Sequence, residues 1–384
     1  MKKTLLGLAA AVATLVLLAE FTDNGHVWQG LRECYLRGYK NAQVDDLQFK
    51  TFRTLPGAET PKAWPLHPRF SRELPPSVED STQAYGTVAL AVVHRDSLLL
   101  DWISDEVPGA DTLRTNAFSM AKTFTALAIG VAVTDGLIAV DDPVSKYLPR
   151  FAEGPGADLT VEHVLQMRSG IPFGENYKNP IGFMAKSTYG EDILDRTAQY
   201  AVEGTAGIPW KYQGGNTLVL QEILSTVVDM PLSDWFAQRV WAPIGAVEPA
   251  AWAVDNQGDE RNYCCFYARA TDYARVGQLL LDSGRVGDRQ LIDRSFMVDL
   301  MRPVGPLPDG TDITHYGYQV WMGTHKGHRF VSCIGLHGQY IAVVPDLDLI
   351  AVRTGFFRPK GKVNHIDIDA YATLDVAMAL TEPG

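Results

Sequence analysis

Cysteine is scarce in this 384-residue chain, and its few copies form no metal-ligand pattern. Neither a CxxC pair nor a Cys/His motif links the four cysteines, which are Cys34, Cys264, Cys265 and Cys333. The sequence therefore predicts neither a zinc site nor a disulfide framework, although a single disulfide stays open. The histidines of "HKGH", His325 and His328, flank a glycine, as is typical of a loop between strands. We expect no metal and no cofactor.

Positive charge is also lacking. The chain has 34 Lys and Arg against 45 Asp and Glu, a net charge of −11, and no run of basic residues. A nucleic-acid partner needs a basic face to neutralise phosphates, so this class of function is excluded. A small-molecule or peptide-like partner is favoured.

A long apolar run is missing except at the N-terminus. There, "MKKTLLGLAAAVATLVLLAEF" places two lysines before an apolar run from about Leu5 to Ala19, the pattern of an export signal. The run is shorter than the roughly 20 residues that span a bilayer, and Leu17 and Ala19 make a poor cleavage site. We expect residues 1–20 to be a signal peptide or an uncleaved membrane anchor, and the protein to reach the periplasm or cell envelope. A buried N-terminal helix is the alternative.

The rest of the chain has an ordinary globular composition, with 46% hydrophobic and 21% charged residues. Residues 21–80 form an arm whose second half is rich in proline. Apolar runs typical of strands lie at both ends of residues 81–384, and helical periodicity dominates between about 140 and 262. The sequence predicts an α+β fold: one antiparallel sheet from both ends of the chain, flanked by helices, with an inserted all-helical subdomain.

"NAFSMAKTFTALAIGVAVTDG" predicts a helix that begins at Ser119 and ends near Asp135, with Gly136 as its cap. Ser119 and Lys122 stand at i and i+3, so their side chains can meet on one helix face. The surrounding residues are apolar, and burial would lower the pKa of Lys122 until a neutral amine can take the serine proton. The N–H of Ser119, in the first turn, is a candidate oxyanion donor. The alternative is a capping serine beside a snorkelling lysine.

Two further motifs carry candidate site residues. "WKYQGGN" places Tyr212 on a Gly-rich turn before a helix, where a neighbouring cation would lower its pKa for general acid/base work. "GLHGQYIAVVP" places His337 and Gly338 at the start of a strand, where Gln339 could offer its N–H to an oxyanion. The alternatives are a packing aromatic for Tyr212 and a histidine bonded only within the sheet.

"SMAK", "YQGGN" and "LHGQ", in this order, resemble the serine β-lactamase and penicillin-binding protein superfamily from about Thr87 to the C-terminus. "DGLIAVDDPVSKYLP", "TVEHVLQMRSGIPFGENY" and "ATDYARVGQLLLDSG" resemble its class C-related branch, which includes esterases and 6-aminohexanoate-dimer hydrolases. The resemblance implies that Ser119 is the acylated nucleophile, Lys122 its partner, and Tyr212 the residue that passes protons. It also implies that Tyr177 helps to deliver a proton to an amide nitrogen.

Two departures from the family pattern bear on the substrate. Gly214 replaces the asparagine of the Y-x-N motif, and the K-T-G triplet appears as Leu336, His337 and Gly338. Loss of the lysine that contacts a substrate carboxylate disfavours β-lactams and D-Ala-D-Ala peptides. We therefore expect a serine hydrolase that cleaves an ester or amide through an acyl-enzyme. A β-lactamase or D-Ala-D-Ala peptidase is the first alternative, and a non-catalytic cell-envelope binding protein is the second.

Overall fold

The computed structural model describes residues 7, 14, 16–19 and 21–382. The predicted export signal over residues 1–20 therefore lies for the most part outside the described residues. Within the described part of the chain, no helix combines the length and apolar character that crossing a membrane requires.

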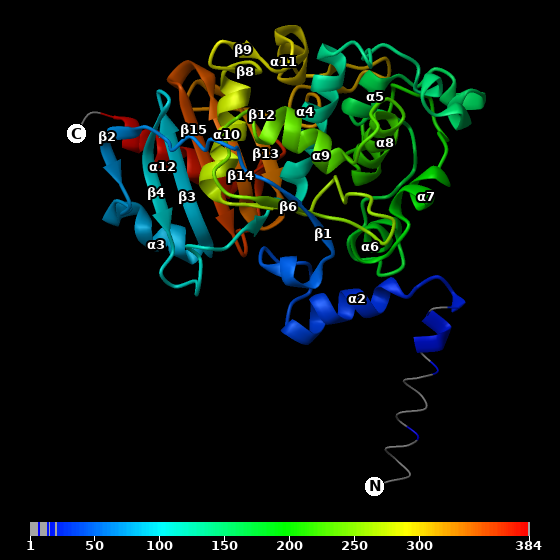
Figure 1. Ribbon diagram of the computed structural model, residues 1–384, viewed down its shortest axis with the longest axis horizontal. Coiled ribbons are helices and arrows are strands. Elements are labelled where there is room, and N and C mark those ends of the chain that lie inside the picture. Colours follow the sequence, from blue (N-terminus) through cyan, green and yellow to red (C-terminus); the bar gives the residue numbers. More distant parts are fainter. Residues whose placement is uncertain (1–6, 8–13, 15, 20, 383–384) are drawn as a thin grey trace.

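A seven-stranded sheet forms the centre of the fold (Figure 1). In spatial order its strands are β12 (Trp321–His325), β13 (His328–Gly335), β14 (Gln339–Val344), β15 (Leu349–Gly355), β3 (Thr87–His94), β4 (Ser97–Ile103) and β2 (Leu66–Ser71). Neighbouring strands run antiparallel except at the edge, where β2 pairs with β4 in parallel. The predicted α+β fold, with an antiparallel sheet built from both ends of the chain, is confirmed.

Alternating side chains give this sheet two buried faces. On β14, Ile341 and Val343 join the larger core, whereas Tyr340 and Ala342 join a second core on the opposite face. Helix α10 (Ala270–Leu281) covers the first face and α12 (Ile368–Thr381) the second. Both sides of the sheet are thus closed to solvent by helices, so the site lies where the sheet meets the helical region.

The helical region packs beside the sheet around the buried helix α4 (Ala121–Thr134), as Figure 1 shows. Its other helices are α5 (Val161–Leu165), α6 (Phe183–Tyr189), α7 (Ile193–Ala198), α8 (Gly214–Ser225), α9 (Leu232–Phe236) and α11 (Arg294–Leu300). One part of the region predicted to be helical is a strand: Ala250–Ala253 forms β6 because it pairs with β1 (Phe52–Leu55). An Ala-rich segment carries no strand signal of its own, so this pairing across the chain decided its structure.

In Figure 1 the N-terminal arm begins with α2 at the bottom of the molecule, crosses the molecule through β1 and reaches β2 at the left edge. It contributes α2 (His26–Glu33), β1 and β2, and α3 (Pro76–Ala84) follows it. β1 belongs to a second sheet of order β1-β6-β7-β5, in which β7 is Phe266–Ala268 and β5 is Thr115–Asn116. The arm also reaches β5, which leads directly into the Ser119 motif, because the Asn116 N–H donates to the Val44 carbonyl at 2.9 Å.

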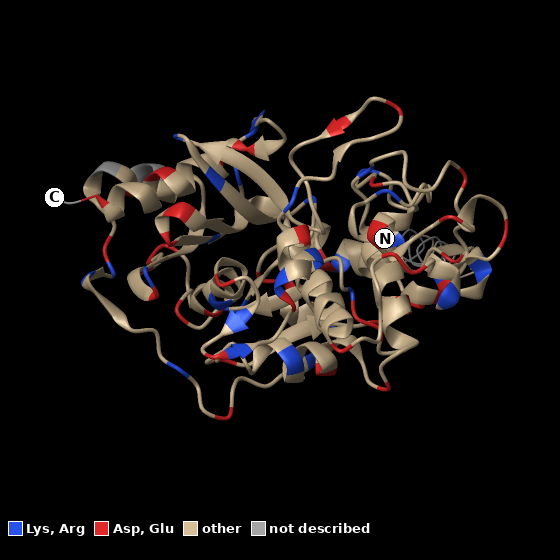
Figure 2. Cartoon of the chain, turned by 90° about the horizontal axis from the view of Figure 1, so that it is seen from above, with Lys and Arg blue, Asp and Glu red and all other residues tan. Residues whose placement is uncertain are grey.

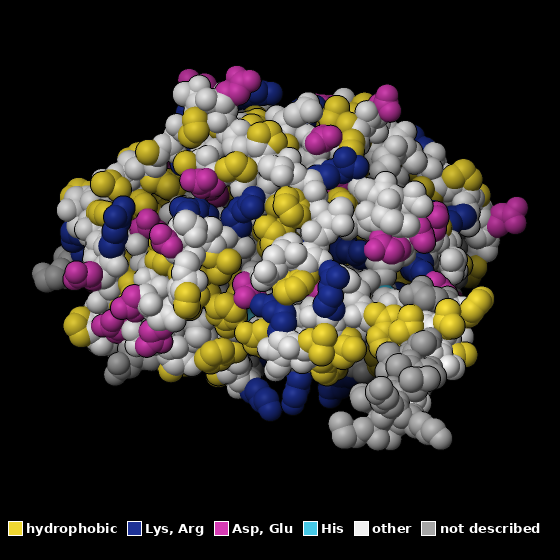
Figure 3. Space-filling view, turned by 60° about the horizontal axis from the view of Figure 1, so that its bottom comes forward, with side chains coloured by type: hydrophobic (Ala, Val, Ile, Leu, Met, Phe, Trp, Pro, Cys, Tyr) yellow, Lys and Arg dark blue, Asp and Glu magenta, His cyan; other side chains and the backbone are white. Residues whose placement is uncertain are grey.

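Lys and Arg are interspersed with Asp and Glu along the ribbon in Figure 2. The face in Figure 3 mixes apolar and charged side chains. Near the N-terminus, Phe21, Tyr35 and Leu36 are exposed.

Candidate active site

Ser119 lies in a tight turn between β5 and α4. The turn is a short 3-10 helix, Phe118–Met120, and α4 begins only at Ala121, so the prediction that the α-helix begins at Ser119 is wrong by two residues. The reason is Phe118, whose φ of +45° lies in the left-handed region and interrupts helical geometry. The Asn116 side chain accepts a hydrogen bond from the Phe118 N–H at 2.9 Å and holds this conformation. Ser119 itself remains partly exposed, as a nucleophile must.

Lys122 lies against Ser119 inside the protein. Its Nζ is 3.0 Å from Ser119 Oγ and 3.0 Å from the backbone oxygen of Tyr263, and the residue is 1% exposed. Burial lowers the pKa of Lys122 to about 8, while the Glu175 carboxylate acts in the opposite direction. The predicted contact and the predicted direction of the pKa shift are both confirmed. Near neutral pH a useful fraction of Lys122 is the neutral amine that can accept the serine proton.

Tyr212 completes the group around Ser119, but its ionisation differs from the prediction. Its ring lies 5.0 Å from Lys122 Nζ, and it precedes α8 as expected. Burial raises the pKa of Tyr212, the Glu175 carboxylate raises it further, and a hydrogen bond with Ser119 only partly opposes them. The predicted lowering is therefore wrong, because burial of the phenol and the negative charge of Glu175 outweigh the effects that favour the phenolate. Tyr212 is a phenol at neutral pH, so it donates protons rather than acting as a phenolate base.

Glu175 and Tyr177 come from the loop that precedes α6. The Tyr177 hydroxyl donates to Glu175 Oε1, and the other oxygen of Glu175 accepts the Gly214 N–H at 2.7 Å. Tyr177 is 61% exposed as a whole, yet burial of its hydroxyl end and the adjacent carboxylate raise its pKa well above the usual range. The loop is therefore tied to the first residue of α8, just after Tyr212, and Tyr177 stands at the outer side of the site.

His337 and Gly338 lie in a turn, so their predicted place at the start of a strand is wrong. Leu336–Gly338 is a 3-10 turn between β13 and β14, with φ of +62° at His337 and +80° at Gly338. Two successive positive φ values reverse the chain, and β14 begins at Gln339. The Nε2 of His337 lies 3.0 Å from the Ala42 carbonyl of the arm, which leaves Nδ1 as the ring nitrogen that could meet a substrate. Burial lowers the pKa of His337.

Gln339 is buried, and its side chain is fully engaged with the backbone. Its amide donates to Gly355 O at 2.6 Å and accepts from Gly355 N–H at 3.1 Å. The side chain thus locks β14 to the end of β15. Oxyanion binding by the Gln339 and Ser119 N–H groups stays a prediction.

Sequence reasoning missed three residues of the site. Glu175 was passed over because a lone acid in a loop gives no pattern, and Tyr263 because it acts through its backbone oxygen. Gly335 ends β13 against the nucleophile turn: a Cβ there would lie 2.2 Å from the Ala117 carbonyl oxygen. Gly214 is explained similarly, because a Cβ would come within 3.1 Å of the Tyr263 ring. Gly214, which replaces the asparagine of the family motif, therefore lets the chain pack closely against Tyr263 beside Lys122.

The arrangement of a serine, a buried lysine and a tyrosine beside the end of β13 defines a serine hydrolase of the beta-lactamase type. The family model described as Beta-lactamase matches residues 76–356, more than half of the chain. The protein belongs to this family. The Ser119, Lys122 and Tyr212 motifs lie within the matched region.

Individual relatives are hydrolases of amides and esters. The chain is 23% identical to the 6-aminohexanoate-dimer hydrolase of Paenarthrobacter ureafaciens over 329 residues, 79% of this chain and 81% of that protein. A solved structure from Bacillus anthracis, assigned as a 6-aminohexanoate-dimer hydrolase, matches with a TM-score of 0.72 and 20% identity, covering 87% of this chain and 92% of that one. A family VIII carboxylesterase matches with a TM-score of 0.63 and 16% identity, covering 82% and 98%.

Proposed function

We propose that this protein hydrolyses an ester or amide through a covalent acyl-enzyme on Ser119. The observation that carries the proposal is the 3.0 Å contact between Lys122 Nζ and Ser119 Oγ. Burial lowers the pKa of this lysine to about 8, close to neutral pH. A neutral amine accepts the hydroxyl proton as Ser119 Oγ forms a bond to the substrate carbonyl carbon. The N–H groups of Ser119 and Gln339 are proposed to hold the oxyanion.

Tyr212 is proposed as the group that returns a proton to the leaving group. Its raised pKa keeps the phenol protonated, and its hydrogen bond with Ser119 places it beside the reacting oxygen. When the carbonyl–heteroatom bond breaks, the leaving oxygen or nitrogen takes the phenol proton, and the lysine restores it to Tyr212. Tyr177 is proposed to help only with amides, whose nitrogen must be protonated before it leaves. Water then attacks the acyl-enzyme and frees Ser119.

We propose that the site does not bind a carboxylate group beside the scissile bond of its substrate. No lysine stands in the Leu336–Gly338 triplet. Arg358, whose positive charge acts on Tyr212, donates to the Asp367 carboxylate, so its charge is already compensated. The negative charge of Glu175 further disfavours an anionic substrate near the lysine. The amide-cleaving and ester-cleaving relatives named above support the same choice.

Substrate competition tests the proposal against a β-lactamase or D-Ala-D-Ala peptidase. We expect turnover of p-nitrophenyl butyrate and little hydrolysis of nitrocefin or of D-Ala-D-Ala peptides. Rapid nitrocefin hydrolysis without esterase activity would overturn the preference for esters and amides.

Covalent labelling tests whether the site is catalytic at all. A fluorophosphonate probe is expected to label the wild type, and Ser119→Ala is expected to remove the adduct while the protein stays folded. Lys122→Ala should lower acylation by several orders of magnitude. A folded wild type without an adduct would favour a non-catalytic binding protein.

We also propose that the protein is exported, on the strength of the two lysines and the apolar run in residues 1–20. Fractionation of cells that express the full chain tests this, with the N-terminal sequence of the mature protein reporting cleavage. Recovery of uncleaved protein only from the cytoplasm would contradict export.

A further inference from the structure

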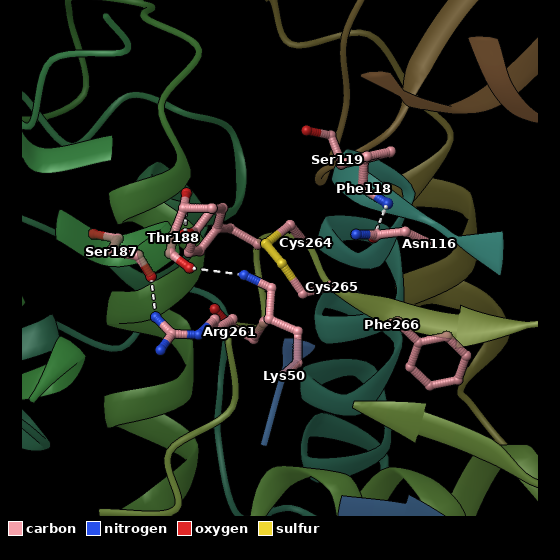
Figure 4. The surroundings of a disulfide bond; sticks show 12 residues. Lys50, Asn116, Phe118, Ser119, Ser187, Thr188, Arg261, Cys264, Cys265 and Phe266 are labelled. Atoms are coloured by element: carbon pink, nitrogen blue, oxygen red, sulfur yellow. Dashed lines mark hydrogen bonds between the residues drawn. A yellow bond between two sulfur atoms is a disulfide. The ribbon is translucent and has the colours of Figure 1, made fainter. Parts of the chain in front are cut away.

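Two cysteines that are neighbours in sequence are joined by a disulfide beside the site. Cys264 and Cys265 lie in the segment between β6 and β7, and both are buried, with 7% and 2% of their surface exposed. Figure 4 shows the bond next to the turn that carries Phe118 and Ser119. A bond between adjacent cysteines closes a small ring through their shared peptide, so the backbone torsions on either side of that peptide lose their freedom.

The backbone on each side of this ring holds a different part of the nucleophile group. Before it, the Tyr263 carbonyl accepts one of the two hydrogen bonds of Lys122 Nζ, at 3.0 Å. After it, the Phe266 carbonyl accepts the Ala117 N–H at 2.7 Å, two residues ahead of Ser119. The relative placement of lysine and serine therefore depends on the backbone of Cys264 and Cys265.

The ring helps to keep Cys265 in an unusual backbone conformation. Its φ is +62°, in the left-handed region that residues with a side chain rarely adopt. The Cys265 carbonyl accepts the Ala253 N–H at 2.9 Å, and the Cys264 carbonyl accepts the Trp252 indole N–H at 3.1 Å. Without the ring, Cys265 is free to leave the left-handed region, and the backbone path from Tyr263 to Phe266 is no longer fixed by the disulfide.

We propose that the Cys264–Cys265 disulfide positions Lys122 against Ser119, and that opening it slows acylation of Ser119. In the opening step the S–S bond breaks as a dithiol reductant supplies two electrons and two protons. Two thiols form, and the reductant is oxidised to its own disulfide. The inference rests on the proposed acyl-transfer function, and it makes the two cysteines positioning residues rather than catalytic ones.

The experiment compares acylation in the two redox states of the folded full chain. Wild type is treated with dithiothreitol, and the gain of two hydrogen atoms is verified by mass spectrometry. The reaction with the fluorophosphonate probe and the kcat and KM for p-nitrophenyl butyrate are then measured. We expect reduction to lower the labelling rate roughly 10- to 100-fold, the range that a misplacement of about 1 Å can cause. The loss should appear in kcat rather than KM, and oxidised dithiothreitol should reverse it.

Matched variants separate this disulfide from the other two cysteines. Cys34→Ser/Cys333→Ser keeps the disulfide and should respond to reductant as the wild type does. Cys264→Ser/Cys265→Ser should be slow and insensitive to reductant, with circular dichroism reporting whether it is folded. If this variant does not fold, the comparison of oxidised with reduced wild type decides. If the buried bond resists reduction in the native state, the comparison of the variant with wild type decides.

Equal labelling rates in verified oxidised and reduced wild type, or a folded Cys264→Ser/Cys265→Ser variant as fast as wild type, would overturn the inference. In both cases the adduct on Ser119 would still form, so the proposed function would stand. Absence of any adduct in the oxidised wild type would instead contradict the proposed function itself.

Discussion

At the scale of single residues, the site depends on the protonation state of one amine. Burial lowers the pKa of Lys122 to about 8 and so favours the neutral amine, while the Glu175 carboxylate favours the ammonium. Both effects act on the pKa of the same group, and both can be measured through the rate of acylation. Two predictions follow from the effects of burial and of Glu175 on the pKa of Lys122.

The first prediction concerns pH. Because only the neutral amine accepts the Ser119 proton, kcat/KM for p-nitrophenyl butyrate should rise about tenfold per pH unit below the lysine pKa of about 8 and level off above it. A pH–rate profile from 6 to 9.5, with stability checked at each pH, measures this. A flat profile over that range would remove Lys122 as the base.

The second prediction concerns Glu175→Gln. Removing the carboxylate takes away the charge that favours the ammonium, so the acid limb of the profile should move to lower pH. Glutamine keeps an acceptor for the Gly214 N–H, which limits any change in structure. Glu153→Gln, at an exposed position, serves as the charge-matched control and should leave the limb in place. An unmoved limb in Glu175→Gln would show that its charge does not reach the lysine.

At the scale of elements, the N-terminal arm braces the nucleophile turn. Asp46 is fully buried, and its Oδ1 accepts from the Asn116 amide at 3.2 Å and from the Tyr267 hydroxyl at 2.6 Å. Asn116 in turn holds Phe118 in its left-handed conformation. A segment distant in sequence thus fixes the residue that precedes Ser119.

The third prediction follows from this chain of contacts. Asp46→Ala should lower the free energy of unfolding by about 1–3 kcal/mol, because it removes the acceptor of the buried Tyr267 hydroxyl, and it should slow fluorophosphonate labelling. Asp46→Asn keeps an acceptor oxygen and should lie closer to wild type in both. Urea unfolding and labelling rates provide the measurements. Wild-type stability and rate in Asp46→Ala would mean that the arm does not brace the turn.

At the scale of the whole molecule, Arg353 ties together segments from both ends of the chain. From β15 its guanidinium donates to Gly338 O and Tyr85 O, each at 2.6 Å, and to Thr87 Oγ1 at 3.0 Å. It also pairs with Asp369 of α12 at 3.4 Å. The turn beside the site, strand β3 and the last helix therefore share one buried cation.

The fourth prediction tests this network. Arg353→Met should lower the free energy of unfolding by about 3–5 kcal/mol, because it leaves the Asp369 carboxylate buried without its partner. The double variant Arg353→Met/Asp369→Leu should recover part of the loss. Urea unfolding of both variants measures it. A single variant as stable as wild type would contradict the role given to Arg353.

Much of the fold and the centre of the site were predictable from local patterns. The strand runs at both ends and the apolar helix after Ser119 are properties of short segments, and the structure has both. The predicted glycine turn before α8 is wrong, because Gly214 and Gly215 are the first residues of the helix. Segments whose structure depends on distant partners were missed. β6 forms only against the arm, and His337 turns away from the expected strand because the chain must reverse between β13 and β14.

The sequence by itself determined that a lysine stands one turn after a serine in an apolar helix, and hence that its pKa is lowered. Spacing and composition suffice for that, because helix geometry and burial act locally. Only the tertiary structure decided the rest: the effect of Glu175 on Lys122 and Tyr212, the raised pKa of Tyr212, and the Cys264–Cys265 disulfide beside the carbonyls that bond Lys122 and Ala117. Electrostatic fields and hydrogen bonds act through space, and no local pattern records which distant residues folding brings together.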